Sequence, residues 1–400
     1  MPGFAARLEK ARVAPTIALT VRARELRAAG KDVVTLTIGE PDFASPPHAI
    51  EAAHAAALRG ETKYPPQDGT TQLKQAVQRK FRRDYGLEYA ASEIVVGNGG
   101  KQVIFDALLA TVEAGDEVLI PTPFWSAYEL MTHVVGGTPT FVSCPQNNGF
   151  RLRPEDLDAA ITPRTRWLFL NAPNNPTGAA YSPADLAAIG AVMLKHPHVW
   201  ILSDDMYEHL VYGGFEYKTL AAVVPELRDR VLTVSGVSKT YAMTGWRIGF
   251  GAGPKNLIAA MGNMQGQATA GVSSVGQAAA AAALDGPQDN VAEMRAIYQR
   301  RRDLVVDALN EIPGISCHRP EGAFYVFPNI AGCLGRTSAG GKLIATDEDF
   351  AVALLEEQYA AVVFGAAFGM SPYLRLSYAT DDDALREGCR RIAAFVAGFK

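Results

Sequence analysis

The stretch VGNGGKQVIFDALL, residues 96–109, places a β-branched apolar run, a glycine-rich turn and an amphipathic helical pattern in direct succession. The same order recurs along the first 290 residues, where short apolar runs alternate with longer helical patterns. Strands are expected at 94–96, 117–120, 140–142, 167–170, 199–203, 231–234 and 248–251. Strands that alternate with helices predict an α/β fold, in which a mostly parallel sheet is covered by helices on both faces. Ligands of such sheets collect at the carboxyl ends of the strands.

The helical segments between these strands have recognisable beginnings and ends. In 70–85, large apolar and aromatic side chains recur every four residues, and Gly86 follows as a stop signal. Segments 183–195 and 254–264 each open with proline, as helices often do. These patterns predict the helices that cover the sheet.

The sequence changes in character after about residue 290. A long polar helix is expected at 293–311, and its run of three arginines at 300–302 is interpreted as a solvated helix face. Short strands are expected around 315, at 323–327 and at 374–378, and a final helix at 384–395. These shorter elements predict a second, smaller domain.

The first 40 residues contain a helical pattern at 16–29 and a strand pattern at 33–38. Two elements cannot bury a core of their own, so we expect them to pack with the C-terminal part. The predicted division is a large domain at 46–290 and a small domain formed by 1–45 together with 291–400.

Composition excludes several classes of protein. The chain has 400 residues, 48% of them hydrophobic and 20% charged, and its net charge of −4 offers no basic surface for nucleic acid or anionic membranes. No stretch approaches the ~18 apolar residues of a membrane span, and the N-terminal residues lack the apolar core of a signal peptide. The four cysteines have no metal-site spacing, and His196 and His198 have no cysteine nearby. We therefore expect a cytoplasmic enzyme without a metal.

The segment SKTYAMTGWRIGF, residues 238–250, contains only two charged side chains, Lys239 and Arg247, among small, apolar and aromatic ones. A lysine that is kept out of water has a lowered pKa, which makes it a nucleophile toward carbonyls and a Schiff-base former. The alternative is a lysine that extends from a buried turn into solvent.

Polar side chains follow three of the expected strands. Asn175 lies in the turn NAPNNPTG (171–178), which is either a simple tight turn or a place where an amide donates to a ligand oxygen. In ILSDDMYEHL (201–210), Asp204 is the better site candidate, and Asp205 is interpreted as a surface cap of the next turn. Trp125 in PTPFWSAY (121–128) is either a core residue or a ring stacked on a planar cofactor.

Two further features suit an anionic ligand. The glycine-rich turn 97–101 opens a helix whose backbone N–H groups suit phosphate, although it is not the G-x-G-x-x-G of dinucleotide sites. Arg375 lies within the apolar run YLRLSYAT (373–380), where a buried guanidinium needs a carboxylate or phosphate partner. A Schiff-base lysine, a phosphate cradle, a stacking ring, an acid and a carboxylate-binding arginine together match pyridoxal phosphate and an amino acid.

With these motifs in this order, the chain resembles class I aminotransferases of the fold-type I pyridoxal-phosphate group, and among them bacterial aspartate aminotransferases. The resemblance runs nearly end to end, through IGEPDF (38–43), KYPPQDGT (63–70), NNPTG, DDMYEH, SKTYAMTGWRIGF, EGAFYVF (321–327) and LRLSYAT. It implies a seven-stranded, mostly parallel sheet in the large domain, a smaller α+β domain, and a homodimer with shared active sites. The implied cofactor is pyridoxal 5'-phosphate.

The resemblance also implies a role for each matching residue. Lys239 would bond the cofactor covalently and shuttle the substrate proton, and Asp204 would pair with the pyridine nitrogen. Tyr207 and Asn175 would hydrogen-bond the phenolic oxygen, and Trp125 would stack on the ring. The phosphate would be bound by Arg247, by the backbone of Gly99, Gly100 and Lys101, and by Tyr64 of the neighbouring subunit. The α-carboxylate of the substrate would be bound by Arg375, with Asn175 and the backbone of Gly39 beside it.

Two departures from the family pattern affect the expected site. Many relatives have a serine three residues before the lysine, where this chain has Gly236, and either Ser235 or Ser238 could compensate. Thr37 and Ile38 are larger than the residues that relatives often have before the glycine, which could tune substrate fit.

The expected reaction is transfer of the amino group of L-aspartate or L-glutamate to 2-oxoglutarate or oxaloacetate, by a ping-pong mechanism through the pyridoxamine form. Arg12 and Lys101 are candidates for the second carboxylate of these substrates. The nearest alternative is an aminotransferase that prefers aromatic amino acids or prephenate. A regulator with an aminotransferase-like domain is a further alternative, although such proteins carry an N-terminal DNA-binding domain.

Overall fold

The computed structural model describes residues 16–400, together with Ala5 and Arg7. Its largest sheet has seven strands in the order β2-β8-β7-β6-β5-β3-β4, and only β8 runs antiparallel to its neighbours. The strands are β2 (Ile94–Gly97), β3 (Glu117–Thr122), β4 (Thr138–Ser143), β5 (Thr165–Asn171), β6 (Trp200–Asp204), β7 (Val231–Gly236) and β8 (Gly249–Ala252). All seven predicted strands are therefore present, and the mostly parallel α/β sheet is confirmed.

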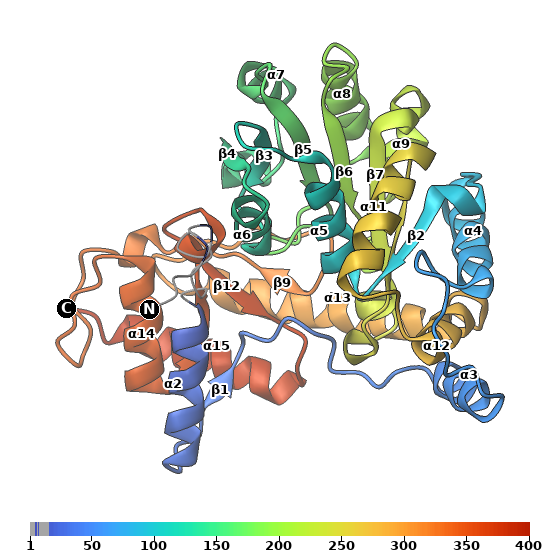
Figure 1. The fold of residues 1–400 in the computed structure, drawn as a ribbon. Helices are drawn as coiled ribbons and strands as arrows, with labels where there is room; N and C mark the ends of the chain where they lie inside the picture. Colours follow the sequence, from blue (N-terminus) through green and yellow to red (C-terminus); the bar gives the residue numbers. More distant parts are fainter. Residues whose placement is uncertain (1–4, 6, 8–15) are drawn as a thin grey trace.

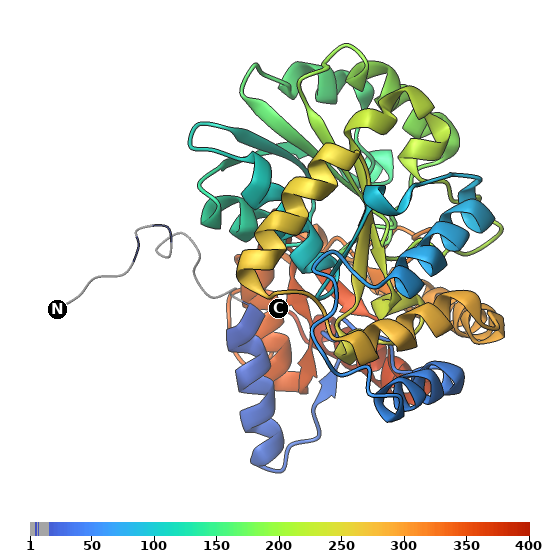
Figure 2. The ribbon, with the colours of Figure 1, turned by 45° about the vertical axis from the view of Figure 1, so that its right-hand side comes forward.

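Helices cover both faces of this sheet (Figures 1 and 2). Within β6, Ile201 packs into one hydrophobic cluster with α7 and α8, whereas the next residue, Leu202, packs into another with α5 and α11. Side chains of a strand alternate between faces, so neighbouring apolar residues supply two different cores. The helices are α3 (Pro47–Leu58), α4 (Thr71–Tyr85), α5 (Gly100–Thr111), α6 (Ala127–Val134), α7 (Pro154–Ala160), α8 (Pro183–Met193), α9 (Leu220–Val223), α10 (Val237–Thr240), α11 (Lys255–Ala268) and α12 (Ser274–Asp285).

Helix α4 ends at Gly86 as predicted, and the structure also shows how it begins. Thr70 is its N-cap, and the Thr70 side chain accepts a hydrogen bond from the Leu73 N–H. Gly86 ends the helix in the left-handed region, with φ of 69°. A hydroxyl that satisfies a free N–H and a glycine that adopts positive φ fix the two ends of the helix.

Two small sheets lie outside the large one (Figure 1). Strand β1 (Val34–Thr35) pairs in parallel with β10 (Ala360–Ala361), and β12 (Leu374–Ser377) lies between β11 (Val363–Phe364) and β9 (Tyr325–Val326) in an antiparallel sheet. The helices of this region are α2 (Thr16–Ala28), α13 (Asp289–Asn310), α14 (Asp347–Gln358) and α15 (Asp382–Ala397). Around residue 315 there is only an isolated bridge between Ser316 and Asn329 instead of the predicted strand.

The N-terminal elements pack with the C-terminal part, as expected. Leu19 and Leu36 belong to the same buried cluster as Leu354 and Leu385. This shared core supports grouping the described residues before 46 with 291–400 in the proposed small domain, whereas the strands of 46–290 form the large sheet and the helices of 46–290 pack around it (Figure 1). The boundaries themselves remain a prediction.

The interpretation of the arginine run as a solvated face is wrong for two of its three residues. Arg301 and Arg302 are buried, and only Arg300 is exposed. The Arg301 guanidinium pairs with Asp42 at 2.9 Å and Asp382 at 3.1 Å. Helix α13 is covered on this side by the chain around residue 42 and by the start of α15, which a single helix pattern cannot reveal.

All four cysteines are buried and unpaired. Among the described residues, no helix combines the length and the apolar composition that a membrane crossing requires.

Candidate active site

A pocket of about 590 Å³ opens at the carboxyl ends of β5, β6 and β7. Strand β6 ends at Asp204, β5 ends at Asn171, and Lys239 follows β7 on the short helix α10. The segments 37–40, 325 and 375 close the pocket from the side of the small sheets. The lining residues are Thr37, Ile38, Gly39, Glu40, Gly100, Lys101, Ile104, Trp125, Tyr128, Asn171, Asn175, Asp204, Met206, Tyr207, Ser238, Lys239, Thr244, Arg247, Tyr325 and Arg375.

The amine of Lys239 is the nucleophile that this pocket offers. Its Nζ donates a hydrogen bond to the Gly39 carbonyl at 2.5 Å and lies 5.9 Å from the centre of the Phe324 ring. Burial lowers the pKa of Lys239 to about 8, although the charge of Glu40 opposes this. About a tenth of the amine is therefore neutral at pH 7, far more than for an ordinary lysine, and the neutral amine is the nucleophile.

Asp204 lies at the end of β6 with its carboxylate buried. Its Oδ2 accepts a hydrogen bond from the Tyr128 hydroxyl, and its Oδ1 lies 3.4 Å from the Met206 N–H, which donates to it. Burial raises the pKa of Asp204 to about 6, so the group is still mostly ionised at neutral pH. Buried carboxylates with perturbed pKa values in a pocket are typical of functional sites.

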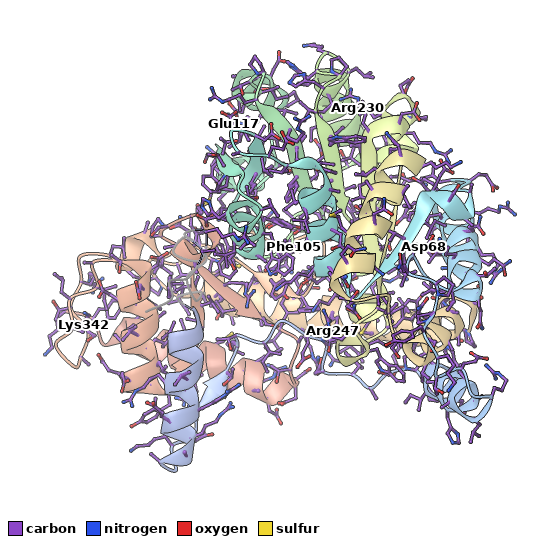
Figure 3. All side chains as sticks on the ribbon, in the orientation of Figure 1. Asp68, Phe105, Glu117, Arg230, Arg247 and Lys342 are labelled. Carbon is purple, nitrogen blue, oxygen red and sulfur yellow. The ribbon has the colours of Figure 1, made fainter. Side chains whose placement is uncertain are left out.

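Arg247 and the start of α5 form a cradle for an anion. Arg247, labelled in Figure 3, adopts φ of 57°, and its guanidinium donates to the carbonyls of Thr244 at 2.9 Å and Asn98 at 3.2 Å. A Cβ placed on Gly99, which has φ of 82°, would lie 2.5 Å from the Arg247 guanidinium. Glycine therefore leaves the space in which the arginine approaches the free N–H groups of the helix start.

Arg375 is buried on β12 without a carboxylate partner among the described residues. Its guanidinium donates to Asn175 Oδ1 at 3.1 Å and to the Thr37 carbonyl at 2.8 Å, and its Nε has no partner within the described part of the chain. Burial lowers the pKa of Arg375. A buried cation that lines a pocket and has no carboxylate partner among the described residues fits an incoming carboxylate.

Lys101, in the first turn of α5, contacts Trp125. The Lys101 ammonium is 4.9 Å from the centre of the Trp125 ring, and no carboxylate pairs with it in the described residues. Burial and then the charge of Arg247 lower the pKa of Lys101. The cation is available to a second negative group of a ligand.

Most residues that the sequence singled out meet in this one pocket. Gly39, Gly100, Lys101, Trp125, Asn175, Asp204, Tyr207, Lys239, Arg247 and Arg375 all line it. Gly99 lies behind the Arg247 guanidinium, whereas Tyr64 is 92% exposed and does not line the pocket of its own chain. Arg12 lies outside the described residues.

The structure distinguishes the two serines near Lys239. Ser238 lines the pocket, whereas Ser235 is buried on β7 and donates to Glu208 Oε1 at 2.5 Å. A Cβ on Gly236 would lie 2.9 Å from the Ile248 carbonyl and 3.1 Å from the Gly249 Cα. Close packing against β8 therefore leaves no room for the serine of the family pattern.

The interpretation of Asp205 as a surface cap is wrong, because its side chain is only 1% exposed. Tyr128 and Glu40 also belong to the site, although neither was singled out from the sequence. Tyr128 follows Trp125 by three residues and their ring centres lie 5.4 Å apart, but no pattern shows that the Tyr128 hydroxyl reaches Asp204. Glu40 lies inside the motif IGEPDF and accepts a hydrogen bond from the Thr244 hydroxyl at 2.7 Å.

Comparisons with known proteins agree with this geometry. The family model of class I and II aminotransferases matches residues 31–392. The aspartate/prephenate aminotransferase of Cereibacter sphaeroides is 56% identical over 390 residues, which are 97% of this chain and 98% of the relative. The aspartate aminotransferase of Rhizobium meliloti is 52% identical over 98% of this chain and 95% of the relative.

Solved structures give the same result. The crystal structure of the Rhizobium meliloti aspartate aminotransferase superposes with a TM-score of 0.98 at 50% identity and covers all of both chains. That of the Thermus thermophilus aspartate aminotransferase with maleate has a TM-score of 0.91 at 38% identity, over 99% of this chain and 100% of the other. The chain therefore belongs to the class I and II aminotransferase family and has its fold-type I architecture.

Proposed function

We propose that this protein is a pyridoxal-phosphate-dependent aminotransferase that moves the amino group of L-aspartate or L-glutamate to 2-oxoglutarate or oxaloacetate. The observation that carries the proposal is the arrangement of three cations in one pocket. Lys239 has a lowered pKa, Arg247 lies in an anion cradle, and Arg375 has a free donor. A nucleophile between two anion sites suits a phosphate at one end and a substrate carboxylate at the other.

The residues present fit pyridoxal phosphate. The Arg247 guanidinium, which approaches because Gly99 has no Cβ, would bind its phosphate together with the N–H groups of Gly100 and Lys101. When bound, the cofactor supplies an electron-poor ring that stabilises the negative charge left when the substrate Cα loses its proton. Trp125 lines the pocket where such a ring would stack.

Asp204 would hold the pyridine nitrogen in its protonated state. Its carboxylate is mostly ionised at neutral pH, and the Tyr128 hydroxyl fixes its orientation. Tyr207 and Asn175 line the same wall and would donate to the phenolic oxygen of the ring. The Tyr207 hydroxyl already lies 3.0 Å from that of Tyr325, so its position is defined on the other side as well.

Lys239 would take the proton from the substrate Cα and deliver it to C4′ of the cofactor. Its lowered pKa gives the amine a larger neutral fraction, able to accept a proton, than an ordinary lysine has. The Gly39 carbonyl, 2.5 Å from Nζ, keeps the amine at the mouth of the pocket.

Arg375 would bind the substrate α-carboxylate with two parallel N–H groups, beside Asn175 and the backbone of Gly39. Lys101 supports a second, weaker contact with the side-chain carboxylate of aspartate or glutamate. Arg12 remains a second candidate for that contact. An aminotransferase that prefers aromatic amino acids or prephenate is the alternative. The 56% identical relative is named for both aspartate and prephenate, and prephenate also carries a second carboxylate.

A panel of amino donors and acceptors, measured on the parent protein and on Lys101→Ala, tests this function. We expect aspartate to have the highest kcat/KM among amino donors, and Lys101→Ala to reduce it about tenfold or more because a charged contact is lost. Phenylalanine turnover should change much less. Lys255→Ala, at the first position of α11, is the matched control of a lysine at a helix start.

Two results would contradict this assignment. Equal losses for aspartate and phenylalanine in Lys101→Ala would exclude Lys101 as the side-chain selector. A parent protein that transfers amino groups to prephenate much faster than to oxaloacetate and 2-oxoglutarate would favour the alternative substrate.

The proposed assembly is a homodimer in the cytoplasm. Tyr64 is 92% exposed and Leu58 is 77% exposed, and an aromatic and an aliphatic side chain so close in sequence suit a protein interface. Tyr64 would reach the phosphate in the pocket of the partner subunit. Four unpaired cysteines are compatible with a reducing compartment.

A further inference from the structure

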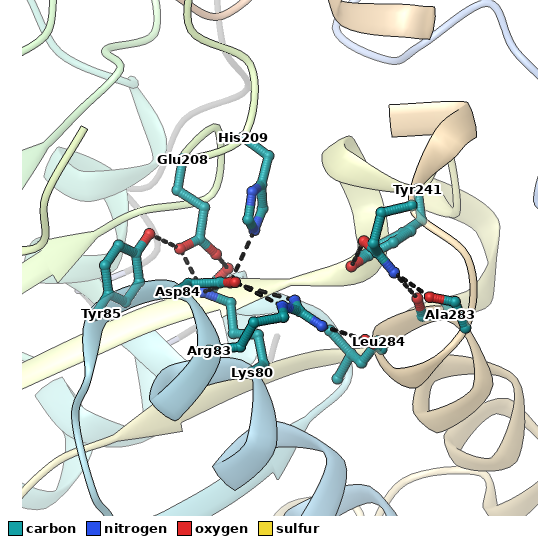
Figure 4. Close-up of polar contacts among 12 residues, drawn as sticks. Lys80, Arg83, Asp84, Tyr85, Glu208, His209, Tyr241, Ala283 and Leu284 are labelled. Atoms are coloured by element: carbon teal, nitrogen blue, oxygen red, sulfur yellow. Dashed lines mark hydrogen bonds and ion pairs between the residues drawn. The ribbon is translucent and has the colours of Figure 1, made fainter. Parts of the chain in front are cut away.

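A buried network of polar side chains lies behind the pocket, centred on Glu208 (Figure 4). Glu208 Oε2 accepts hydrogen bonds from Lys80 Nζ at 2.5 Å and from the Tyr85 hydroxyl. Glu208 Oε1 accepts from Ser235 Oγ at 2.5 Å. The side chains of Glu208 and Lys80 are each only 1% exposed.

The three donors come from two elements, and the carboxylate comes from a third segment. Lys80 and Tyr85 lie on the last turns of α4, and Ser235 lies on β7, four residues before Lys239. Glu208 follows Tyr207 directly in the turn after β6. One carboxylate therefore joins α4 to the two segments that present Tyr207 and Lys239 to the pocket.

Glu208 is ionised although it is buried. Burial raises the pKa of Glu208, but the ammonium of Lys80 and the other donors outweigh this and hold the pKa below its ordinary value. Lys80 Nζ also lies 3.3 Å from Asp84, which in turn contacts Arg83 at 2.7 Å and His209 at 3.2 Å. Asp84, Glu208 and His209 are close enough to hold a cation, but Lys80 already places a positive charge beside both carboxylates, so we assign no metal to them.

Stability alone is a poor reason for this arrangement. Removing two charges from water is costly, and an apolar pair of similar volume often stabilises a fold as well or better. What an apolar pair lacks is direction, because the hydrogen bonds of Glu208 fix the distance and orientation of the segments that make them. A second-layer contact of this kind commonly orients the residues that touch a ligand.

We propose that Glu208, held ionised by Lys80, is a positioning residue of the active site. It fixes the turn 204–209 against the end of β7. The Tyr207 hydroxyl is thereby held where it can donate to the phenolic oxygen of the cofactor bound at Lys239. The inference rests on the proposed function. A hydrogen bond to the phenolic oxygen of bound pyridoxal phosphate stabilises the deprotonated form of the lysine-bound cofactor. Displacement of Tyr207 weakens this hydrogen bond, so the pH at which the visible absorption band is half converted rises.

Three variants test this role. Ser235→Ala removes one hydrogen bond and leaves the ion pair, so it is the variant that should fold most readily. Lys80→Met leaves Glu208 buried without its counter-charge, and Lys80→Met/Glu208→Gln removes both charges. Arg79→Met is the control, since Arg79 lies next to Lys80 on α4 and pairs at the surface with Asp285.

The measurements are the melting temperature of the apoprotein, the pH midpoint of the absorption band after reconstitution with pyridoxal phosphate, and kcat and KM for aspartate. We expect Ser235→Ala to raise the midpoint by about 0.5 pH unit, the effect of one modest hydrogen bond, and to lower kcat severalfold while KM changes less than about twofold. Lys80→Met should also lower the melting temperature. The double variant should recover the melting temperature but keep the raised midpoint.

A network that serves stability alone gives a different pattern. In one such pattern, the pH midpoint of the absorption band in every variant equals that of Arg79→Met. In the other, the double variant returns to the parent values of both the pH midpoint and the melting temperature. Either result overturns the inference. A parent protein without the visible band or without aspartate turnover would instead refute the proposed function. The absorption and melting data separate these two failures.

Discussion

Asp205 lies directly after Asp204, with its side chain buried beneath the pocket. Ser203 Oγ donates to its Oδ1 at 2.6 Å. Burial and then the negative charge of Glu208 raise the pKa of Asp205 to about 7. The folded protein therefore keeps a proton that the unfolded chain releases from about pH 4 upward. The stabilising contribution is complete below about pH 4 and is lost as the pH rises through about 7.

Asp205→Asn removes this titration. From about pH 5 to 7 the free energy of unfolding of the parent apoprotein should fall, with Asp205 contributing up to ~1.4 kcal/mol per pH unit. The variant should show a smaller fall over the same range, whatever its absolute stability. Urea unfolding at about one-unit steps from pH 5 to 8 measures this.

The exposed Asp383→Asn at the start of α15 is the control and should follow the parent curve. If the curves of Asp205→Asn and the parent run parallel across this range, Asp205 does not hold the proton.

At the scale of elements, the turn between β2 and α5 depends on Gly99. Its φ of 82° already disfavours other residues, and a Cβ would come within 2.5 Å of the Arg247 guanidinium. Gly99→Ala should therefore displace Arg247 from the phosphate. Because a charge-assisted hydrogen bond contributes ~1.5–3 kcal/mol, we expect the affinity of the apoprotein for pyridoxal phosphate to fall about tenfold or more.

Gly115→Ala separates backbone strain from the steric effect. Gly115 has φ of 101°, and a Cβ added there would have no heavy atom within 4 Å, so the variant carries similar strain far from any clash. Titration of the apoprotein with the cofactor should give the parent affinity for Gly115→Ala. Equal affinities for both variants would show that the close approach of Arg247 to residue 99 is not needed for phosphate binding.

Most of the elements could be predicted from the sequence because their signals are local. Period-2 and period-3.6 apolar patterns, the Thr70 cap and the Gly86 stop depend on neighbours in the chain. The burial of Arg301 and Asp205 could not be predicted, because it depends on segments far away in the sequence, such as Asp42 against α13.

The candidate site was predictable for a related reason. Parallel strands bring their carboxyl ends together, so a ligand site at this edge of the sheet was expected from topology, whereas the roles of Asp204 and Lys239 were implied by the family resemblance. The hydrogen bond from Tyr128 to Asp204 and the second layer around Glu208 follow from side-chain packing, which leaves no signal in spacing.

At the scale of the whole molecule, the proposed homodimer makes a prediction about mixed subunits. Lys239→Ala disables the site of its own chain, whereas Tyr64→Ala weakens the site of the partner. In a hybrid of the two variants, the site with the intact Lys239 receives its Tyr64 from the Lys239→Ala chain. Random reassortment should then restore about a quarter of the parent sites, because half of the dimers are hybrids with one intact site each.

Denaturing and refolding an equimolar mixture, followed by an aspartate assay, measures this restoration. Lys239→Ala mixed with Arg375→Ala is the control in which both changes affect the site of their own chain, so its hybrids should gain no activity. A mixture with Tyr64→Ala that recovers no more activity than the sum of its parts would mean that Tyr64 does not act across the interface.

The central claim is that Lys239 is the residue that bonds the cofactor. Reduction of the reconstituted protein with borohydride, followed by digestion and mass analysis of the peptides, tests it most directly. We predict a visible absorption band that reduction abolishes, and one pyridoxyl-phosphate label per chain on Lys239. A label on another lysine, or a protein that acquires no visible band with pyridoxal phosphate, would contradict the account.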